Sequence, residues 1–405
     1  MLIATTSFAS LQPHIRKLFL SRAPMCACSS FVHSMKNFGQ SSTFELLVAS
    51  ANGNEETTKR CTVRVIPTWT DEFHISGTFT GDEVDKLVES TDDNGRTNIA
   101  MVLMPKQSTA NVTVSLPEHS HLSLESQTPT NVEVGGKLEG NVSIRTVQGD
   151  ISVNKVRGED IVLISGDGHV TIRSMLEGQQ CIRGLSVTAK RLMGKSIDIM
   201  ASGINGISVG AVYGGNYTLR ASNGAVSGDA VQGTLAVKCA EDISVGGMDG
   251  DVKLLSAHGD VSVHFESVPA GTVSTVSVPE GDVKVSVNHD VTTRVHLKGD
   301  SIDVPTHLQD MQGDEKPSSN GPRKSFEDII VSSSVPGRSS LFESGKIRTA
   351  KNTGWDTECD DLGTGSIVAT ANQGQATFRI ASWIEQTLKR VERKQREKEG
   401  ERIKR

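Results

Sequence analysis

The sequence predicts an all-β protein, a single-stranded and right-handed β-solenoid that is capped at both ends and carries a short C-terminal helix. The first observation is a phrase that recurs between residues 140 and 304: a Gly-Asp or Gly-Asn pair, then alternating apolar and polar residues. Such alternation after a turn pair is typical of a half-buried strand. The second observation is the spacing of Gly140, Gly149 and Gly158, which lie nine residues apart. A strand and turn of about nine residues, doubled, give a coil of about 18 to 22 residues, the repeat length of a solenoid.

The repeated phrase is clear in seven places and degenerate between them. It stands at 140–144, 149–153, 242–245, 250–254, 259–263, 281–285 and 299–304. Composition agrees, since only 4% of the residues are aromatic and 39 of 405 are glycine, which suits a narrow interior filled by β-branched side chains. The alternative is a β-sandwich of short strands, but a sandwich does not require a repeated phrase.

At each corner of a coil we expect glycine to supply a positive φ and Asp or Asn to hydrogen-bond its own backbone. Apolar residues at alternate positions then point inward and stack on the same positions one coil away. In the phrase GDVSVHF, this alternation places Val261, Val263 and Phe265 inside. It places Ser262 and His264 outside.

Residues 1–45 differ from the rest of the chain in charge. Arg16, Lys17, Arg22 and Lys36 are present, and no acidic residue precedes Glu45. A basic, Ser-rich, acid-poor and amphipathic N-terminus is typical of a mitochondrial presequence. We therefore predict a mitochondrial protein, in the matrix, whose residues 1–45 are a cleavable presequence. The alternative is a disordered N-terminal tail.

The solenoid domain is predicted over residues 61–308. Strands alternate across 61–138, but the repeat is faint there, so this part is assigned to the first coils and the N-terminal cap, because a terminal coil exposes a sheet edge. Residues 309–353 are rich in Pro, Ser and Gly, and we predict a disordered linker or insert.

The C-terminal end is predicted to close the solenoid. Residues 363–388 contain two alternating stretches and then Ser382, which can cap a short helix. We expect a returning strand and helix that cap the last coil. The charged tail at 389–405 is interpreted as a solvated extension. The alternative is that it forms a weak binding site for an anionic partner.

The net charge of −6 argues against general nucleic-acid binding, and no stretch is long and apolar enough for a transmembrane helix. The repeated Gly-Asp resembles the calcium-binding β-roll motif, but that motif requires paired glycines and an Asp aimed into the turn. Most turns here offer one carboxylate before an inward Val or Ile. We therefore predict no metal ligand, and no cofactor-binding residue either.

No catalytic residue is predicted. The sequence contains no phosphate-binding loop, nucleophile elbow or HExxH motif, and no carboxylate pair is marked for glycoside chemistry. The alternative is a carbohydrate-binding or carbohydrate-active β-helix protein. Three outward carboxylates with Arg or Lys on adjacent coils would favour that alternative.

The cysteines do not form a disulfide framework. Cys61, Cys181 and Cys359 are isolated, and Cys239 continues an apolar alternation, which predicts a buried small hydrophobe. Three glycosylation triplets begin at Asn111, Asn141 and Asn216, but a strand-rich sequence full of Ser and Thr forms such triplets by chance.

The Gly-Asp-Val/Ile-x-Val coils resemble the bacterial adhesin-like β-solenoid domains. The stretches at 206–217, 257–263 and 376–383 are similar in wording and order to an animal family known as family with sequence similarity 185. The resemblance implies a mitochondrial, non-enzymatic β-solenoid without catalytic residues. We therefore expect an interaction or scaffold protein that binds protein partners.

Overall fold

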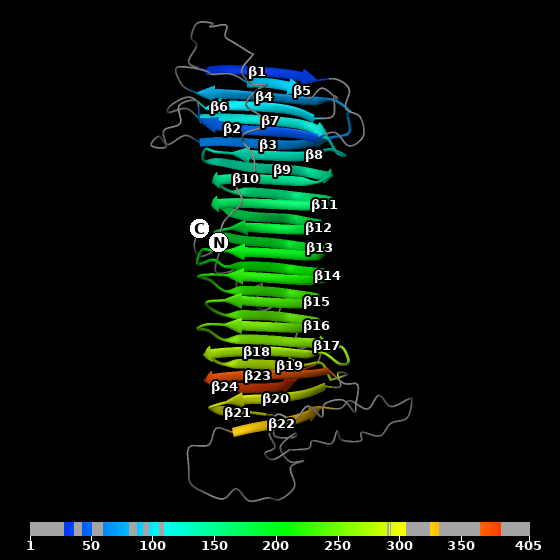
Figure 1. Ribbon diagram of the computed structural model, residues 1–405, viewed down its shortest axis with the longest axis vertical. Coiled ribbons are helices and arrows are strands. Elements are labelled where there is room, and N and C mark those ends of the chain that lie inside the picture. The colour runs from blue at the N-terminus through cyan, green and yellow to red at the C-terminus, as the bar shows by residue number, and fades with distance from the viewer. Residues whose placement is uncertain are drawn as a thin grey trace, which may run out of the picture.

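The computed structural model describes residues 28–35, 43–50, 60–80, 87–91, 97–104, 109–289, 291, 293–304, 325–331 and 365–381. The 24 strands found in these ranges belong to one hydrogen-bonded sheet that winds into a long rod (Figure 1). The prediction of an all-β solenoid is therefore confirmed, while its handedness stays a prediction. None of the described residues is helical, so no membrane-spanning helix occurs among them. The helix expected after Ser382 falls outside the described ranges.

Six long strands form the central coils. They are β11 (Ile151–Asp167), β12 (His169–Gly184), β13 (Ser186–Ala201), β14 (Ile207–Ala221), β15 (Val226–Cys239) and β16 (Ile243–Ser256). Each strand pairs in parallel with the next. Val170 faces Val187, 17 residues on, and Val187 faces Ile207, 20 residues on, so the second coil has the predicted length of about 18 to 22 residues and the first is one residue shorter.

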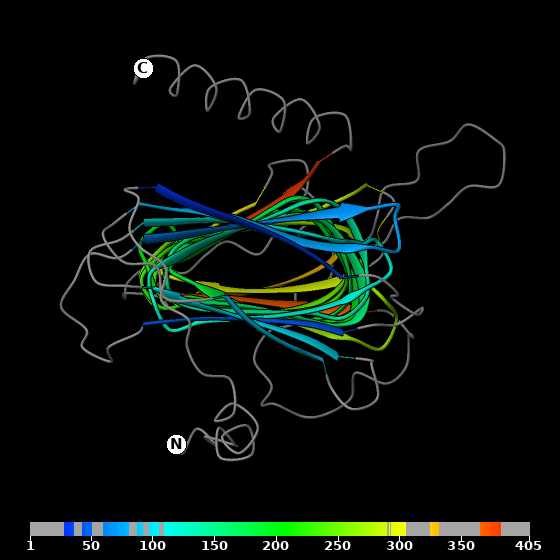
Figure 2. The same ribbon diagram turned by 90° about the horizontal axis from the view of Figure 1, so that it is seen from above.

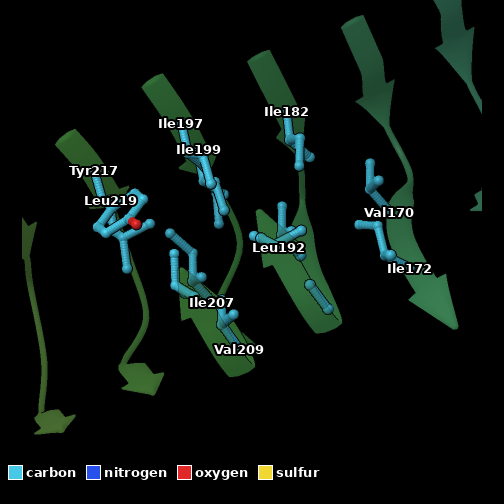
Figure 3. Packing of buried hydrophobic residues seen from close by; sticks show 14 of the residues in the cluster. Val170, Ile172, Ile182, Leu192, Ile197, Ile199, Ile207, Val209, Tyr217 and Leu219 are labelled. Atoms are coloured by element: carbon cyan, nitrogen blue, oxygen red, sulfur yellow. The ribbon is translucent and has the colours of Figure 1, made fainter. Parts of the chain in front are cut away.

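Each long strand bends in the middle, so every coil contributes to two faces of a flattened rod (Figure 2). Face 1 is defined by the first halves of β11–β16 and face 2 by their second halves. In β14, Ile207 and Val209 of face 1 and Tyr217 and Leu219 of face 2 are all at most 3% exposed. Figure 3 shows such side chains pointing into the space between the faces. Burying one of them contributes about 1.5–3 kcal/mol, which makes this interior the main source of stability.

The bend itself depends on glycine. Gly214 has a φ of 138°, and a Cβ there would lie 2.1 Å from the backbone oxygen of Gly194 in the neighbouring coil. Gly194 has the same relation to Gly178, at 2.0 Å. Glycine therefore permits both the positive φ and the close approach of successive coils at this corner.

At the N-terminal end, spatial order departs from chain order. These strands are β1 (Cys28–Met35), β2 (Thr43–Ser50), β3 (Arg60–Thr68), β4 (Phe73–Thr80), β5 (Leu87–Thr91), β6 (Thr97–Met104), β7 (Thr109–Pro117), β8 (His121–Ser126), β9 (Thr130–Glu139) and β10 (Val142–Gln148). The coil β2–β3 lies between the coils β6–β7 and β8–β9 (Figure 1). Antiparallel strands cover the edge: β4 and β1 on face 1, and β5 on face 2.

The C-terminal end repeats this arrangement. Its strands are β17 (Val261–Ser267), β18 (Val273–Glu280), β19 (Val283–Val287), β20 (Thr293–Gly299), β21 (Ser301–Asp303), β22 (Ser325–Val331), β23 (Gly365–Gln373) and β24 (Gln375–Ile380). The last coil, β23–β24, lies between β18–β19 and β20–β21 (Figure 1). Antiparallel β22 then covers β20.

Several boundaries differ from those predicted. The solenoid core begins before residue 61, because Phe44 and Val48 of β2 are 0% exposed within it, and β1 and the start of β2 fall inside 1–45. The stretch 309–353, predicted as a linker, contains the strand β22. The strands β23 and β24, which were predicted to cap the C-terminal end, are last in chain order but lie one coil inside that end of the rod. In each case, pairing with strands distant in sequence decided the position.

The register prediction in β17 is confirmed with one exception. Val261, Val263 and Phe265 are buried and Ser262 is exposed, but His264 is only 3% exposed. Its Nδ1 lies 3.0 Å from the Oγ of Ser286 in the adjacent strand β19. The outside position predicted for His264 is therefore wrong, and alternation does not reveal the polar contact that it makes with the next coil.

Candidate interaction surface

The turn aspartates form a ladder along one corner of the rod. Oδ1 of Asp242 accepts a hydrogen bond from the backbone N–H of Asp260 at 2.8 Å, and Oδ1 of Asp260 accepts one from Asp282 at 2.9 Å. Oδ1 of Asp282 accepts one from Gln375 at 2.9 Å. The predicted hydrogen bond between each turn Asp and its own backbone is therefore wrong, because the side-chain oxygen accepts from a backbone N–H of the next coil. Stacking places each carboxylate beside the turn N–H groups of its neighbour.

Asparagine side chains accept the same type of hydrogen bond between coils nearer the N-terminus. Oδ1 of Asn131 accepts from the N–H of Asp150, and Oδ1 of Asn141 accepts from Glu159 and Asp160. These contacts assign the repeated Asp and Asn a structural role between coils. Within the described residues, no group of three or more His, Cys, Asp or Glu side chains is arranged to hold a metal ion.

The opposite corner carries ion pairs near the N-terminal end. Nζ of Lys137 lies 2.9 Å from Oε1 of Glu118 and also contacts Glu139. Nε of Arg157 donates to Oε2 of Glu177 at 2.8 Å. The hydrogen bond from Lys137 lowers the pKa of the Glu139 carboxyl, and the same contact raises the pKa of Lys137. These groups therefore stabilise each other as charged forms.

This corner contains part of the arrangement named for the carbohydrate alternative: Glu139 and Glu177 are partly exposed beside Lys137 and Arg157, whereas Glu118 is buried. Glycoside hydrolysis needs one carboxyl that stays protonated near neutral pH, so its pKa must be raised. The pKa of Glu139 moves in the opposite direction. The cluster resembles an ion-pair network more than an acid–base pair.

Face 1 presents paired charges and a row of hydroxyls. Glu133 accepts from Nε of Arg64 at 3.2 Å and from an Nη of Arg173 at 2.9 Å, so one carboxylate spans two arginines. Beside it a row of outward hydroxyls runs along successive coils in direct register. The row consists of Ser152, Thr171, Thr188, Ser208, Ser227, Ser244 and Ser262. The exposed cations Lys190 and Arg191 lie toward the end of this face in β13.

Face 2 presents a different row, which we call the basic stripe. Its seven residues are direct register partners on successive coils, without a break. They are Arg145, Ile164, Arg183, Met200, Arg220, Lys238 and Leu255. Neighbouring strands lie about 4.8 Å apart, so the stripe runs about 29 Å along the rod.

The cations of the basic stripe lie on the outer surface of face 2. Arg145, Arg183, Arg220 and Lys238 are all exposed. Among the residues that the structure describes, none of these four forms an ion pair with a carboxylate. The apolar members are half-buried or exposed, with Leu255 at 38%. Charge available for a partner and apolar surface therefore alternate from Arg145 to Arg220 on one flat face.

The sequence analysis did not identify this stripe. The signal was present, because each cation directly follows an inward aliphatic residue: Ile144, Ile182, Leu219 and Val237. The repeated phrase is degenerate in the middle of the chain, so the register between coils does not follow from the sequence pattern there. The register seen in the structure brings the cations into one row.

The described thiols are free, and two of them are buried. Burial raises the pKa of Cys61 to about 12 and that of Cys239 to about 11. The prediction that Cys239 is a buried small hydrophobe is confirmed. A thiolate is the reactive form of cysteine, so neither residue is suited to nucleophilic chemistry.

Residues 57–328, more than half of the chain, match the family model described as Toastrack DUF4097. No curated protein matches the chain. Among solved structures, the chain is similar to a "putative cell adhesion protein" from Clostridium sporogenes, at 9% identity and a TM-score of 0.17, over 87% of this chain and 100% of that one. It is also similar to a "putative lipid binding protein" from Parabacteroides distasonis, at 11% identity and a TM-score of 0.23, over 64% of this chain and 90% of that one. At these TM-scores, neither similarity supports an argument about function.

Proposed function

The chain belongs to the Toastrack DUF4097 family, and from this premise we propose that it is a non-enzymatic, adhesin-like interaction or scaffold protein that binds protein partners. The observation that carries the proposal is the basic stripe of face 2, an unbroken row of cations and apolar side chains on one flat face. On face 1 and at the adjacent corner, Arg64, Arg157 and Arg173 are paired with carboxylates, and the exposed cations Lys190 and Arg191 lie outside this row. On face 2, Arg183 and Arg220 are exposed without such a pair in the described part of the chain.

A surface of this kind is suited to binding. The rod supports its outer rows on stacked strands, so their spacing is fixed before a partner arrives, and a preorganised surface loses less conformational entropy on binding. Unpaired cations also attract a complementary partner without first breaking an internal ion pair.

The test is proximity labelling from the full chain in cells, comparing two double variants of equal charge change. Arg183→Glu with Arg220→Glu alters face 2, whereas Lys190→Glu with Arg191→Glu alters exposed cations outside the stripe. We expect the first variant to lose a defined set of neighbours that the second retains. Equal neighbour sets for both variants and the unaltered chain would contradict a binding role for face 2.

The proposal includes a mitochondrial location, in the matrix, and it narrows the cleavable segment. Phe44 is fully buried in the solenoid core, and β1 begins at Cys28, so we place the cleavable part before residue 28. Residues 1–27 fused to a fluorescent protein should direct it to mitochondria. Secretion of the fusion, or a glycan on Asn111 or Asn216, would contradict this location. The relation to the animal family with sequence similarity 185 is part of this proposal, and it is supported by the similar sequence stretches at 206–217, 257–263 and 376–383.

A second candidate, carbohydrate binding, is favoured by one observation only, the corner cluster around Lys137, Glu139 and Arg157. Paired charges of this type can hydrogen-bond sugar hydroxyls. Glu139→Gln keeps the shape of the side chain and removes the charge. Binding to a glycan array that this variant abolishes would support the candidate, and an array without signal would exclude it.

A further inference from the structure

We propose that the basic stripe of face 2 docks an acidic amphipathic helix, which lies along the rod axis and crosses the strands. The inference rests on the proposed binding function and names the chemistry of the partner. Its starting point is the order of the row: cations and apolar side chains alternate over five coils. In sequence from one coil to the next they are Arg145, Ile164, Arg183, Met200 and Arg220.

The spacing of the row favours a helix over an extended chain. Cations two coils apart are separated by about 9.6 Å, twice the distance between neighbouring strands. Residues i and i+7 of an α-helix lie on the same side about 10.5 Å apart. Acidic residues at i, i+7 and i+14 therefore match Arg145, Arg183 and Arg220 within about 2 Å overall, which long arginine side chains accommodate.

The apolar members complete the match. Ile164 and Met200 are half-buried and lie midway between the arginines. On the helix, positions i+3 or i+4 and i+10 or i+11 fall midway between the acidic residues and on the same face. Beyond Arg220 the row continues as Lys238 and Leu255, so one further turn of the helix meets a cation and the turn after it meets an apolar side chain.

An extended peptide fits this row poorly. Its side chains on one face recur at about 6.7 Å, which matches neither one coil nor two. The charges of an anionic membrane surface have no fixed spacing, so binding to a membrane would not require cations and apolar side chains to alternate. Charge complementarity and periodicity together favour the acidic helix, and the membrane becomes an outcome of the test.

The probe is a designed helical peptide of about 21 residues with Glu at positions 1, 8 and 15 and Leu one turn after the first and the second Glu. Its binding to the full chain is measured by fluorescence anisotropy at low and at elevated salt. We expect saturable binding that weakens with salt, because the contacts include exposed charges. A scrambled peptide of the same composition should bind about tenfold more weakly, since its charges no longer face one side.

Protein variants locate the site. Arg183→Glu with Arg220→Glu should weaken binding at least about tenfold, while Lys190→Glu with Arg191→Glu should change it less than about twofold. Arg183→Gln with Arg220→Gln serves where charge reversal disturbs folding. A photoreactive group at peptide position 11 or 12 should cross-link to Met200 or, if the helix runs in the opposite direction, to Ile164, and cross-linking elsewhere would contradict the docking geometry.

The outcomes separate this inference from the proposed function. Equal binding of the scrambled peptide, or no binding, would overturn the acidic helix while leaving the cellular labelling result to decide whether face 2 binds proteins. Vesicles of phosphatidylcholine and phosphatidylglycerol provide the last comparison. Binding to these vesicles that the Arg183 and Arg220 variants abolish, without peptide binding, would overturn the proposal in favour of a membrane surface.

Discussion

Oδ1 of Asp260 accepts a hydrogen bond from the backbone N–H of Asp282, which lies in the next coil of the stack, at 2.9 Å. The same carboxylate residue donates its own backbone N–H to Asp242 in the preceding coil. One turn residue thus links three coils. This relation explains why Asp and Asn recur at this corner of the sequence repeat, and it can be tested directly.

Replacing Asp260 with alanine should remove one link of this ladder. We expect a loss of about 1 kcal/mol in stability, similar to the loss of a capping side chain, and faster hydrogen exchange at the Asp282 amide. Asp260→Asn retains Oδ1 and should behave like the unaltered chain. Equal losses in both variants, or a melting temperature that rises strongly with calcium over chelator, would contradict the structural role.

The interior of β17 gives a second prediction. Val261→Asp would place a carboxylate where the side chain is 0% exposed, and a buried unpaired charge costs several kcal/mol. Ser262→Asp adds the same charge at an exposed position and should cost about 0.5 kcal/mol or less. Hydrogen exchange should show loosening of neighbouring coils first in the Val261 variant. A larger effect at Ser262 would show that the assigned register is wrong.

Two glycines in adjacent coils allow a matched comparison. Gly214→Ala would strain a φ of 138° and bring Cβ to 2.1 Å from a backbone oxygen, so we expect a loss of about 1–3 kcal/mol or more. Gly228→Ala meets nothing closer than 3.4 Å and lies in register between Val209 and Val245. That change should be neutral or stabilising by less than about 1 kcal/mol. Chemical denaturation of both variants measures the difference.

The buried thiols predict a loss of stability at alkaline pH. Because the folded-state pKa of Cys61 is about 12 and its unfolded value is near 9.0, the unfolded chain loses this proton first as pH rises. Between these values each pH unit favours unfolding by about 1.4 kcal/mol for one such group. Cys239 contributes in the same direction. Cys61→Val should reduce the slope of stability against pH, and an unchanged slope would contradict the assignment.

The intercalated last coil predicts a local effect of truncation. A chain that ends at residue 353 lacks β23–β24, so β18 and β20 each lose a parallel neighbour. Exchange should rise in β18, β19 and β20 and stay unchanged in β11–β14, because coils interact mainly with their neighbours. A chain that ends at residue 381 retains the coil and is the control. Uniform destabilisation would argue against the intercalated arrangement.

The sequence by itself determined the solenoid, because its interior is filled by local alternation. Val261, Val263 and Phe265 are inside as that pattern requires, and the coil length follows from the distance between equivalent turns. Both properties depend only on residues close together in the chain.

Only the tertiary structure decided what depends on pairing between distant residues. The insertion of β2–β3 and β23–β24 one coil inside each end follows from hydrogen bonds between strands separated by long segments, which no local pattern encodes. The contact between His264 and Ser286 and the partner of each turn Asp have the same origin. The basic stripe is the clearest case, because coils of unequal length set the register that brings Arg145, Arg183 and Arg220 into one row.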